Sequence, residues 1–542
     1  MRKSHHIWLP LLLVCVATVG ASAQSFRVQC PTTTSLHPSG TASAPFTGPV
    51  AGTVTIHPDL GNAFQLPSHD NGGAVKCQEV SGGDGYATMA DGTQTYLFGF
   101  GPLSGLGLIA NGEPGTELAG DFNQAYTDGP NFLNGQPNPN YNPASPNPNG
   151  AITDVAAIMH TAVMNANMPA PLIAIDEDDE FFLTLSNVGM IMRPDLFEQH
   201  TIHFHGYPNA SSFYDGVPDA SVAINIGGSF TYYYLAPDAG TYFWHCHITP
   251  PEHLQMGMVG QIYVRPRQNR VPGSMTVYQA LLASQNDLRI ASNCSKDILC
   301  STPLPPSDDG VLGGYVYDSA KHTGSATKMF AYNDGDGSTR YDVEYPIQIH
   351  GFDPNFHFVG MTFNPEGFAD MKDKYFLLNG RSYPDTLNTT GNWDPSYGSS
   401  QTPAIYTQVA DGTNHPSQPL PTLIQLKQGQ RALLRISDLD VTEFQTLASV
   451  GIPMQVIALN ARLLRDEAGN NMYYNTNSIT LGGGESLDVI LDTCSARGPA
   501  PAFTCTTPVA TGRYFLFTPQ LDHLSNDAEN FGGLMTEVDV TN

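Results

Sequence analysis

Short apolar runs rich in aromatic and β-branched residues recur through most of this 542-residue chain, and Gly- or Pro-containing turns separate them. Examples are residues 96–100, 171–175, 181–185, 230–235 and 261–264, and later 375–378, 432–436, 454–458, 487–491 and 514–517. Runs of this length and composition are typical of β-strands. About 18 % of the residues are Gly or Pro, which favours many turns. The pattern predicts an all-β fold built from two β-sandwiches.

The distribution of these runs also predicts a domain organisation. We expect a signal peptide at 1–23, an N-terminal strand and turn extension at 24–90, a first sandwich at 91–268, a connector at 269–330 and a second sandwich at 331–542. The connector contains one expected short helix near 275–284. Residues 240–247 resemble residues 512–519, and each segment follows a Gly-rich turn and a strand. This internal similarity indicates duplication of one sandwich.

The first residues predict export. Arg2 and Lys3 precede an apolar run at 7–17, and small residues at 21–23 form a cleavage site. The run is too short to span a bilayer, and no later run of 18 apolar residues follows. We therefore expect a periplasmic or extracellular protein without a membrane span.

The cysteines agree with an oxidising compartment. Removal of the signal peptide leaves seven of the eight cysteines, and an odd number requires a reason. Pairing neighbours in sequence gives three expected disulfides: Cys30–Cys77, Cys294–Cys300 and Cys494–Cys505. Cys246 is then left unpaired, between two histidines.

The net charge limits the partners. The chain carries 23 basic and 50 acidic residues, a formal charge of −27. Because a nucleic-acid binder needs a cationic surface to meet phosphates, the composition excludes that class. It suits small or cationic partners.

Two short segments contain most of the histidines. The first is His200-Thr-Ile-His203-Phe-His205, and the second is His245-Cys246-His247, which His253, Met256 and Met258 follow. If both segments are strands, alternate side chains share a face. The alternation predicts two groups. One contains His200, Cys246, His253 and a nearby Met, and the other contains His203, His205, His245 and His247.

The two groups differ in chemistry. One thiolate, two imidazoles and a thioether form the ligand set of a blue-copper site. Four imidazoles suit copper or zinc, and a copper cluster needs further ligands. The alternatives are a structural zinc site and exposed histidines that bind no metal. Neither accounts for the unpaired cysteine together with the Met. Copper is the prediction that remains.

These motifs resemble those of the multicopper oxidases, the laccase-like cupredoxin proteins. The resemblance covers about 171–266, is fainter over 376–540, and includes Asp215-Gly216-Val217-Pro218 between the two motifs. It implies two cupredoxin-like Greek-key sandwiches. It implies type 1 copper ligands His200, Cys246 and His253 with axial Met258, a type 2 ligand His203, and type 3 ligands His205, His245 and His247. Met256 is the alternative axial ligand. The resemblance also implies a proton-transfer role for Asp215, which can equally begin a turn.

The chain departs from the family pattern in two ways. His253 follows Cys246 by seven residues instead of five, which is closer to the copper nitrite reductases. The second half contains no His-x-His motif: Phe517, Thr518 and Pro519 stand where His245, Cys246 and His247 would, and 441–451 contains no histidine. The resemblance thus implies a copper-free second domain and half of a trinuclear cluster. A homo-oligomer or a partner subunit can complete the cluster, or the chain holds only type 1 copper with at most one extra ion.

The expected function is that of an exported copper-dependent oxidoreductase of multicopper oxidase type. It would oxidise a phenolic or metal-ion donor by one electron and reduce oxygen, with Cys246, His245, His247 and Asp215 as the catalytic residues. The alternatives are a blue-copper electron-transfer protein without oxidase turnover and an enzyme similar to copper nitrite reductases.

Overall fold

A computed structural model gives the arrangement of the chain. It describes residues 26–37, 45–47, 72–110, 112–129, 132–133, 136–138, 141–206, 211–236, 238–284, 303–318, 320, 323–362, 367–388, 406–408, 414–530 and 532–542. The expected signal peptide at 1–23 and the expected Cys294–Cys300 disulfide lie outside these residues.

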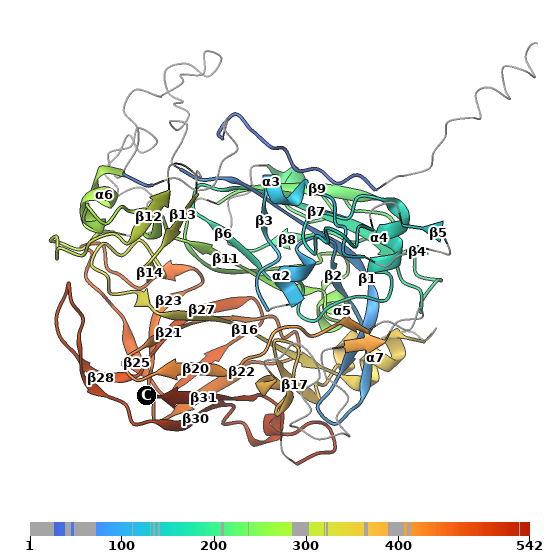
Figure 1. The fold of residues 1–542 in the computed structure, drawn as a ribbon. Coiled ribbons are helices and arrows are strands. Elements are labelled where there is room, and N and C mark those ends of the chain that lie inside the picture. Colours follow the sequence, from blue (N-terminus) through green and yellow to red (C-terminus); the bar gives the residue numbers. More distant parts are fainter. Residues whose placement is uncertain are drawn as a thin grey trace, which may run out of the picture.

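The first half of the chain forms a sandwich of two sheets, drawn from blue to green in Figure 1. The first sheet has the order β2 (Gln94–Pro102), β1 (Val75–Thr88), β7 (Glu180–Gly189), β9 (Ser229–Leu235), with β3 (Glu117–Leu118) beside β1. The second has the order β6 (Ile173–Asp176), β11 (Val259–Arg265), β10 (Gly240–His245), β8 (His203–Phe204).

The second half forms a second sandwich, drawn from yellow to red. Its larger sheet has the order β17 (Tyr375–Leu378), β16 (Val343–Phe352), β21 (Arg431–Asp438), β27 (Glu485–Asp492), β23 (Met454–Leu459), β24 (Arg462–Leu463), with β25 (Tyr474–Thr476) beside β23. Its other sheet has the order β20 (Ile424–Lys427), β31 (Met535–Thr541), β30 (Gly512–Phe517), β22 (Gln445–Val450), β26 (Ser478–Leu481). The expected all-β fold of two sandwiches is confirmed.

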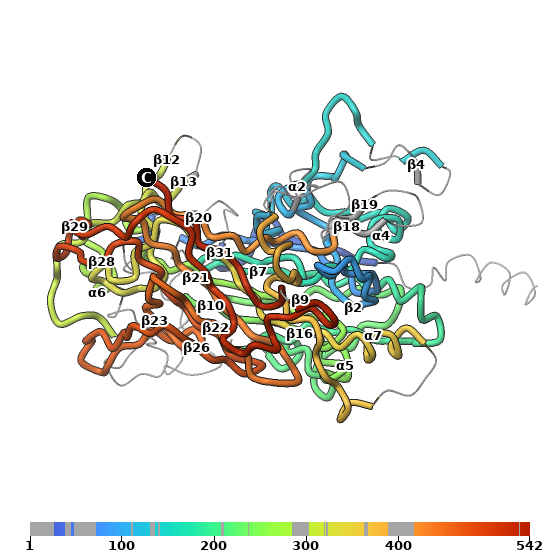
Figure 2. The backbone as a smooth tube through the Cα atoms, turned by 90° about the horizontal axis from the view of Figure 1, so that it is seen from below, coloured from blue at the N-terminus to red at the C-terminus, as the bar shows by residue number. Residues whose placement is uncertain are grey.

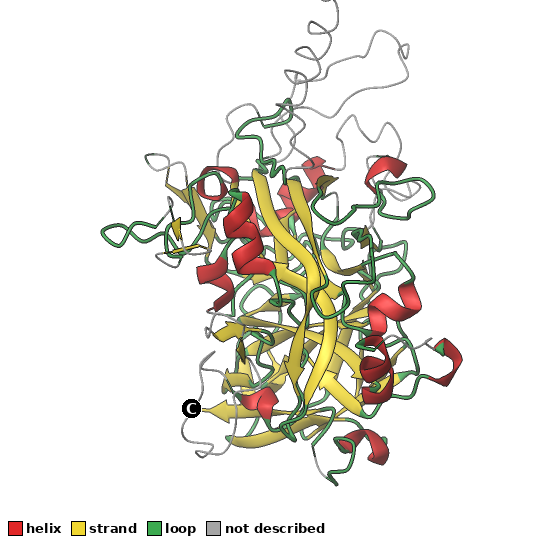
Figure 3. Ribbon diagram, turned by 90° about the vertical axis from the view of Figure 1, so that its right-hand side faces the viewer, coloured by secondary structure: helices red, strands yellow, loops and turns green. Residues whose placement is uncertain are grey.

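Helices are short and lie around the strands (Figure 3). They are α2 (Leu106–Ala110), α3 (Ala119–Phe122), α4 (Val155–Ala162), α5 (Pro250–Gln255), α6 (Val277–Ser284), which is the expected connector helix, and α7 (Pro354–Gly360). The 3-10 turns are η2 (Ser212–Tyr214), η3 (Arg267–Arg270), η5 (Phe368–Asp370), η6 (Asp385–Leu387) and η8 (Leu521–Leu524). In the part of the chain that the structure describes, no helix has the length and apolar character needed to cross a membrane.

Small two-stranded sheets decorate the sandwiches. They are β4 (Phe132–Leu133) with β5 (Gln136–Pro137), β12 (Tyr315–Asp318) with β13 (Thr323–Ala326), β14 (Met329–Phe330) with β15 (Arg340–Tyr341), β18 (Tyr406–Gln408) with β19 (Asn414–Pro416), and β28 (Cys494–Arg497) with β29 (Cys505–Pro508). The expected disulfides Cys30–Cys77 and Cys494–Cys505 are both present. The second one links the strands of the β28–β29 hairpin.

The first sandwich begins earlier than the expected boundary at residue 91. Strand β1 lies between β2 and β7, and its pairing with β7 is parallel over Val75–Gly83. The Gly-rich stretch 81–85 within β1 suggests turns in sequence, but it lets neighbouring groups approach the strand closely. A Cβ atom on Gly82, for example, would lie 2.7 Å from the His200 ring.

Equivalent strands of the two sandwiches pair in the same way, as an internal repeat predicts. His203 pairs with His245 and His245 with Val259, while Ala448 pairs with Phe517 and Phe517 with Met535. Gly206 and Gly451 occupy equivalent places with φ of 81° and 89°. Added Cβ atoms there would lie 2.8 Å and 2.7 Å from Tyr242 and Tyr514, so both turns require glycine.

Apolar side chains from alternate strand positions fill each sandwich. The first core contains Phe98, Phe181, Tyr232 and Trp244, and the second contains Ile436, Val456, Val489 and Leu516, all fully or almost fully buried. Complete burial of an aliphatic or aromatic side chain contributes about 1.5–3 kcal/mol. The two sandwiches lie against each other (Figure 2). Strand β10 of the first contacts β21 and β27 of the second.

A buried charge network crosses this junction. The Arg435 guanidinium bonds Glu344 at 3.0 Å and lies 4.6 Å above the ring of Tyr263 in the first sandwich. Thr241 donates to Asp488 at 2.5 Å, and Gln261 donates to the Arg435 carbonyl at 2.9 Å. Strands of both halves are thus joined through largely buried polar and charged groups.

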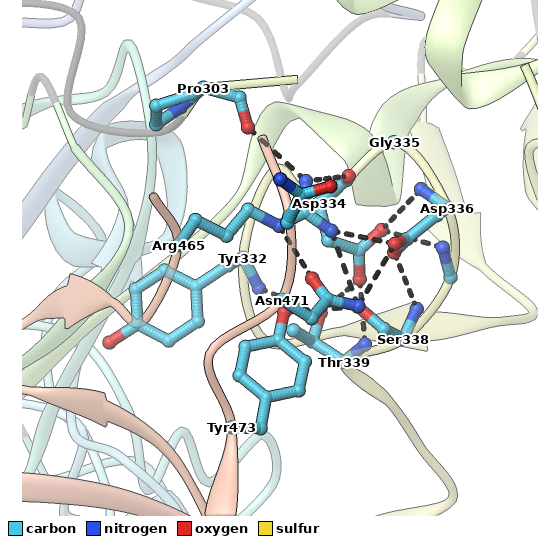
Figure 4. A network of polar contacts seen from close by, with 12 residues as sticks. Pro303, Tyr332, Asp334, Gly335, Asp336, Ser338, Thr339, Arg465, Asn471 and Tyr473 are labelled. Carbon is cyan, nitrogen blue, oxygen red and sulfur yellow. Dashed lines mark hydrogen bonds and ion pairs between the residues drawn. The ribbon is translucent and has the colours of Figure 1, made fainter. Parts of the chain in front are cut away.

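A second network holds the connector against the second sandwich (Figure 4). The Asp334 carboxylate accepts from the backbone N–H groups of Gly337 and Thr339 at 2.7 Å and 2.8 Å, which shapes the loop 334–339. Arg465 donates to Asp336 at 2.8 Å and to the Pro303 carbonyl at 3.2 Å. A guanidinium therefore neutralises this acidic loop.

We predict that Arg435→Ala destabilises the protein by about 3–5 kcal/mol, because it leaves the buried carboxylate of Asp488 without its cation and removes one of the two cations beside Glu344. Burial alone would raise the pKa of Glu344, but Arg265 and Arg435 lower it to about 2. The ionised Glu344 thus stabilises the folded state fully above its pKa in the unfolded chain, near 4.3. This stabilisation is lost as the pH falls toward 2. Urea unfolding at pH 7 measures the loss.

The matched control is Arg462→Ala, since Arg462 is exposed on β24. It should change the unfolding free energy by less than about 0.5 kcal/mol. Equal effects of the two substitutions would contradict a structural role for the junction network.

Candidate metal centre

Local strand geometry sorts the histidines as expected. His200 forms an isolated bridge with Ile224, with two backbone hydrogen bonds of 3.1 Å and 3.0 Å, and β8 begins three residues later at His203. Strand β10 ends at His245, opposite His203. The side chain of Cys246 then points into the sandwich core, where it is fully buried, while the neighbouring His245 contacts the His203 ring.

The first group gathers His200, Cys246 and His253. Their ligand atoms all lie within 4.8 Å of one another, and all three side chains are fully buried. Cys246 Sγ lies 3.2 Å from His253 Nδ1 and 4.0 Å from His200 Nδ1. Among the described cysteines, Cys246 is the free one.

Backbone bonds fix the segment that closes this group. The Cys246 N–H donates to the Met258 carbonyl at 3.2 Å, and the Met258 N–H donates to the His253 carbonyl at 2.8 Å. The longer spacing between Cys246 and His253 forms helix α5, whose first turn begins with Pro250 and Pro251. Met256 and Met258 are both fully buried in the same core.

The electrostatics favour a thiolate. Burial raises the pKa of Cys246, but the attraction of His253 and the hydrogen bonds from His200 and His253 outweigh it and lower the pKa well below its usual value. Burial lowers the pKa of His253, but Cys246 and Glu198 raise it to about 10. The pair is a thiolate beside an imidazolium, and replacing the proton by a metal cation preserves the charge balance.

Sequence reasoning missed Glu198. Its carboxylate lies 3.6 Å from Nε2 of His253, on the far side of the ring from Cys246. The neighbouring His253 imidazole lowers the pKa of Glu198. Glu198 lies two residues before His200, so its sequence position could have suggested a role. Only the folded structure shows that it lies beside His253, 55 residues later.

The second group gathers His203, His205 and His245, whose ligand atoms also lie within 4.8 Å of one another. His205 Nε2 and His245 Nε2 are 2.9 Å apart. His247 lies at the edge of this group, with its ring centre 5.0 Å from that of His203. The structure therefore brings all four histidines to one face, three of them within reach of a single ion.

Neighbouring carbonyls orient these rings. Nδ1 of His245 donates to the Cys246 carbonyl at 2.7 Å, and Nδ1 of His203 donates to the Asp215 carbonyl at 2.6 Å. Donation at Nδ1 leaves Nε2 of each ring as the ligand atom. Burial lowers the pKa of His205 to about 4 and that of His245 to about 3, so both rings are neutral and available to a metal at pH 7.

Asp215 lies beside this group. Its carboxylate is 3.6 Å from His203 Nδ1, and its backbone ends the turn η2. The following Gly216 has φ of 78°, so the segment also forms the turn that the sequence suggested. The position is compatible with both expected roles of Asp215.

The second sandwich holds helix α5 in place. His350 donates from Nε2 to the Leu254 carbonyl at 2.8 Å, and His357 Nε2 lies 3.0 Å from the Gln255 carbonyl. The Gln255 side chain donates to Asp373 at 3.0 Å and accepts from the Asp353 N–H at 2.9 Å. These histidines have no motif in the sequence, and their role depends on how the two halves meet.

A cavity of about 510 Å³ lies where the sandwiches meet. His205 and His245 form one wall, helix α5 another, and the loops 439–444 and 482–484 of the second sandwich the rest. One edge of the four-histidine face therefore opens toward the second half of its own chain.

The second sandwich retains the backbone arrangement of the first group, but among the three ligands it keeps only a histidine, His523 at the place of His253. The Thr518 N–H donates to the Leu534 carbonyl at 2.9 Å, and the Leu534 N–H donates to the His523 carbonyl at 3.0 Å, as Cys246, Met258 and His253 do. Gln445 occupies the place of His200 and lies 2.9 Å from His523. Glu443 occupies the place of Glu198 and lies 3.3 Å from His523.

Both donor sets fit copper. The first offers a buried thiolate and two imidazole nitrogens, with the thioethers of Met256 and Met258 nearby, a combination that suits copper better than structural zinc. The second offers three imidazole nitrogens that already converge. Imidazole ligands suit copper, and a three-ligand site leaves positions for other molecules.

Comparisons with known proteins agree with this chemistry. Residues 151–269 match the family model described as multicopper oxidase. A laccase of Aspergillus fumigatus is 34 % identical over 109 residues, which cover 20 % of this chain and 17 % of the laccase. A copper-containing nitrite reductase of Rhizobium meliloti is 32 % identical over 120 residues, 21 % of this chain and 28 % of that protein.

The chain matches less than a third of the length of each of these two relatives. The segment that matches the family model contains both donor sets. Among solved structures, the blue copper oxidase from Nitrosomonas europaea aligns with a TM-score of 0.46 at 17 % identity, covering 86 % of this chain and 85 % of that one. Residues 151–269 are thus similar to the multicopper oxidases.

We predict that Gln445→His, Thr518→Cys and Leu534→Met together give the second sandwich the donor set of the first, and with it the same copper binding. His523 and Glu443 are already in position. The ligand positions would be Gln445, Thr518, His523 and Leu534, which are all fully or almost fully buried. The copper-loaded triple variant should show about twice as much blue absorption per mole of protein as the native chain.

The control variant carries Gln445→His and Leu534→Met without the cysteine, and it should gain no absorption. A folded triple variant with unchanged absorption would contradict the equivalence of the two pockets.

Proposed function

We propose that this protein is an exported copper-dependent oxidoreductase, because residues 151–269 match the multicopper oxidase family model. It oxidises a phenolic or metal-ion donor by one electron and couples this to oxygen reduction. The single observation that carries the proposal is the position of Cys246. This residue belongs to one donor set, and its two covalent neighbours, His245 and His247, belong to the other.

His200, Cys246 and His253 would hold type 1 copper, with Met258 as the axial ligand. Their burial excludes water from this set. Bound copper would supply a one-electron redox centre here and an oxygen-binding centre at the second set. The chain itself provides the path between the sets, since the backbone of Cys246 continues directly into both histidines.

His203, His205, His245 and His247 would hold the type 2 or type 3 copper. The low pKa values of His205 and His245 keep these rings ready for a metal at neutral pH. Asp215, 3.6 Å from His203, would hold the proton that oxygen reduction consumes. We assign the catalytic roles to Cys246, His245, His247 and Asp215.

The second sandwich would be a copper-free domain. Phe517 and Thr518 stand at the places of His245 and Cys246, and Ala448 at that of His203. We propose that a full cluster is completed by a second copy of the chain or by a partner subunit. The small donor and oxygen are the other partners, and the charge of −27 disfavours nucleic acid.

Two other functions stay open. A blue-copper electron carrier would use only the first donor set. Reduction of nitrite is favoured by the match to the Rhizobium meliloti nitrite reductase and by the close approach of His205 to His245. Export to the periplasm or the extracellular space follows from the expected signal peptide at 1–23.

We predict that His245→Ala and His247→Ala reduce oxygen uptake by at least about tenfold while the blue absorption persists, because they remove ligands from the second set only. A Clark-type electrode with a phenolic donor measures the rate. His160→Ala is the control, since this residue lies on α4 and belongs to neither donor set.

Unchanged oxygen uptake in both variants would show that the second set is not the site of oxygen reduction. Blue protein that consumes no oxygen in any form would identify an electron carrier. Turnover of nitrite with an artificial donor would identify the third function.

A further inference from the structure

Strands β1 and β7 lose their regular register beside the first donor set. The parallel pairing is regular up to Gly82 with Asn187. The next pair is Gly83 with Gly189, so β7 has one extra residue here, which is a β-bulge. We propose that this bulge positions His200 for copper: Asn187 fixes the backbone around the ligand, and Gly82 fixes its ring. This role deepens the proposed copper binding of the first donor set and rests on it.

The Asn187 side chain binds the backbone around His200. It is fully buried, and its Nδ2 donates to the carbonyls of Glu198 and Ile224 at 2.8 Å each. Its Oδ1 accepts from the Gly189 N–H at 2.9 Å, which fixes the orientation of the amide. Ile224 in turn forms the isolated bridge with His200, with backbone bonds of 3.1 Å and 3.0 Å. One amide therefore holds the segment that carries the ligand together with the segment that pairs with it.

The His200 ring depends on packing for its orientation. Metal-ligating histidines usually donate their other ring N–H to an oxygen, as His203 and His245 do from Nδ1. Within the described ranges of the chain, Nε2 of the fully buried His200 has no hydrogen-bond partner. Because the torsion of an imidazole about its Cβ–Cγ bond is broad, neighbouring atoms must hold this ring in place.

Gly82 provides such a contact. A Cβ atom on Gly82 would lie 2.7 Å from Cδ2 and 3.2 Å from Cγ of His200, and the first distance is too short for two carbon atoms. The ring therefore lies directly on the bare backbone of β1. A methyl group at position 82 would displace the ring from the place where its Nδ1 lies 4.0 Å from Cys246 Sγ.

The test compares the copper sites of Gly82→Ala and Asn187→Leu with the site of the native chain. Each variant has a matched control outside the donor set. Gly314→Ala would place a Cβ atom 2.8 Å from Lys328 Cβ in the connector, so it is almost equally crowded. Asn526→Leu removes an equally buried amide that bonds backbone groups of the second sandwich.

Copper(II) titration of the full chain, followed by blue absorption and electron paramagnetic resonance, gives the readout. Gly82→Ala and Asn187→Leu should each weaken copper binding at the first set by at least about tenfold and shift the blue band, because they displace a ligand. Gly314→Ala and Asn526→Leu should change neither property, even where they lower the urea midpoint. A native copper site in the first two variants, or equal effects in the controls, would overturn the proposal.

Copper-free protein separates this result from the proposed function. Gly82→Ala should lower the urea midpoint of the native chain. It should lower that of the His200→Ala variant by less than half as much, because the ring that the methyl group meets is then absent. Equal losses in the two backgrounds would overturn the role of Gly82. If the native chain binds no copper but the losses differ as expected, the copper function fails and the positioning of His200 by Gly82 stands.

Discussion

The strand register around β10 is the constraint on which the candidate site depends. Because β10 pairs with β8 on one side and β11 on the other, the Cys246 side chain points into the core and those of His245 and His247 point to the opposite face. One segment of three residues therefore contributes to a buried thiolate site and to an imidazole face. A shift of the register by one residue would exchange the two faces and separate both donor sets.

The second sandwich lacks the ligands of the first but supports them. Its His350 and His357 hold helix α5, whose His253 completes the first donor set. Its loops close the cavity in front of His205 and His245. The two sandwiches thus contain similarly built pockets: the first gathers the candidate metal ligands, and in the second Gln445, Thr518 and His523 form ordinary hydrogen bonds. The buried Arg435 network fixes the orientation in which the second copy supports the first.

The sequence alone predicted what local periodicity determines. The all-β class, both sandwiches, the helix near 275–284, two disulfides and the sorting of the histidines by strand alternation all agree with the structure. The boundary at residue 91 was wrong, because β1 pairs with a strand about a hundred residues later and its glycines suggest turns. Glu198, the support of α5 by His350 and His357, and the junction cavity were not predictable, since each depends on contacts between segments far apart in the chain. The assigned roles of Met258 and Asp215 stay proposals.

The central claim is that one chain holds copper in two linked donor sets. Metal analysis of the copper-loaded protein, with visible absorption and electron paramagnetic resonance on the same sample, tests it most directly. The account predicts more than one copper per chain, a blue absorption that Cys246→Ser abolishes, and a second copper signal that Cys246→Ser leaves in place. One copper per chain without a second signal would contradict it, and so would a blue colour that survives the loss of Cys246.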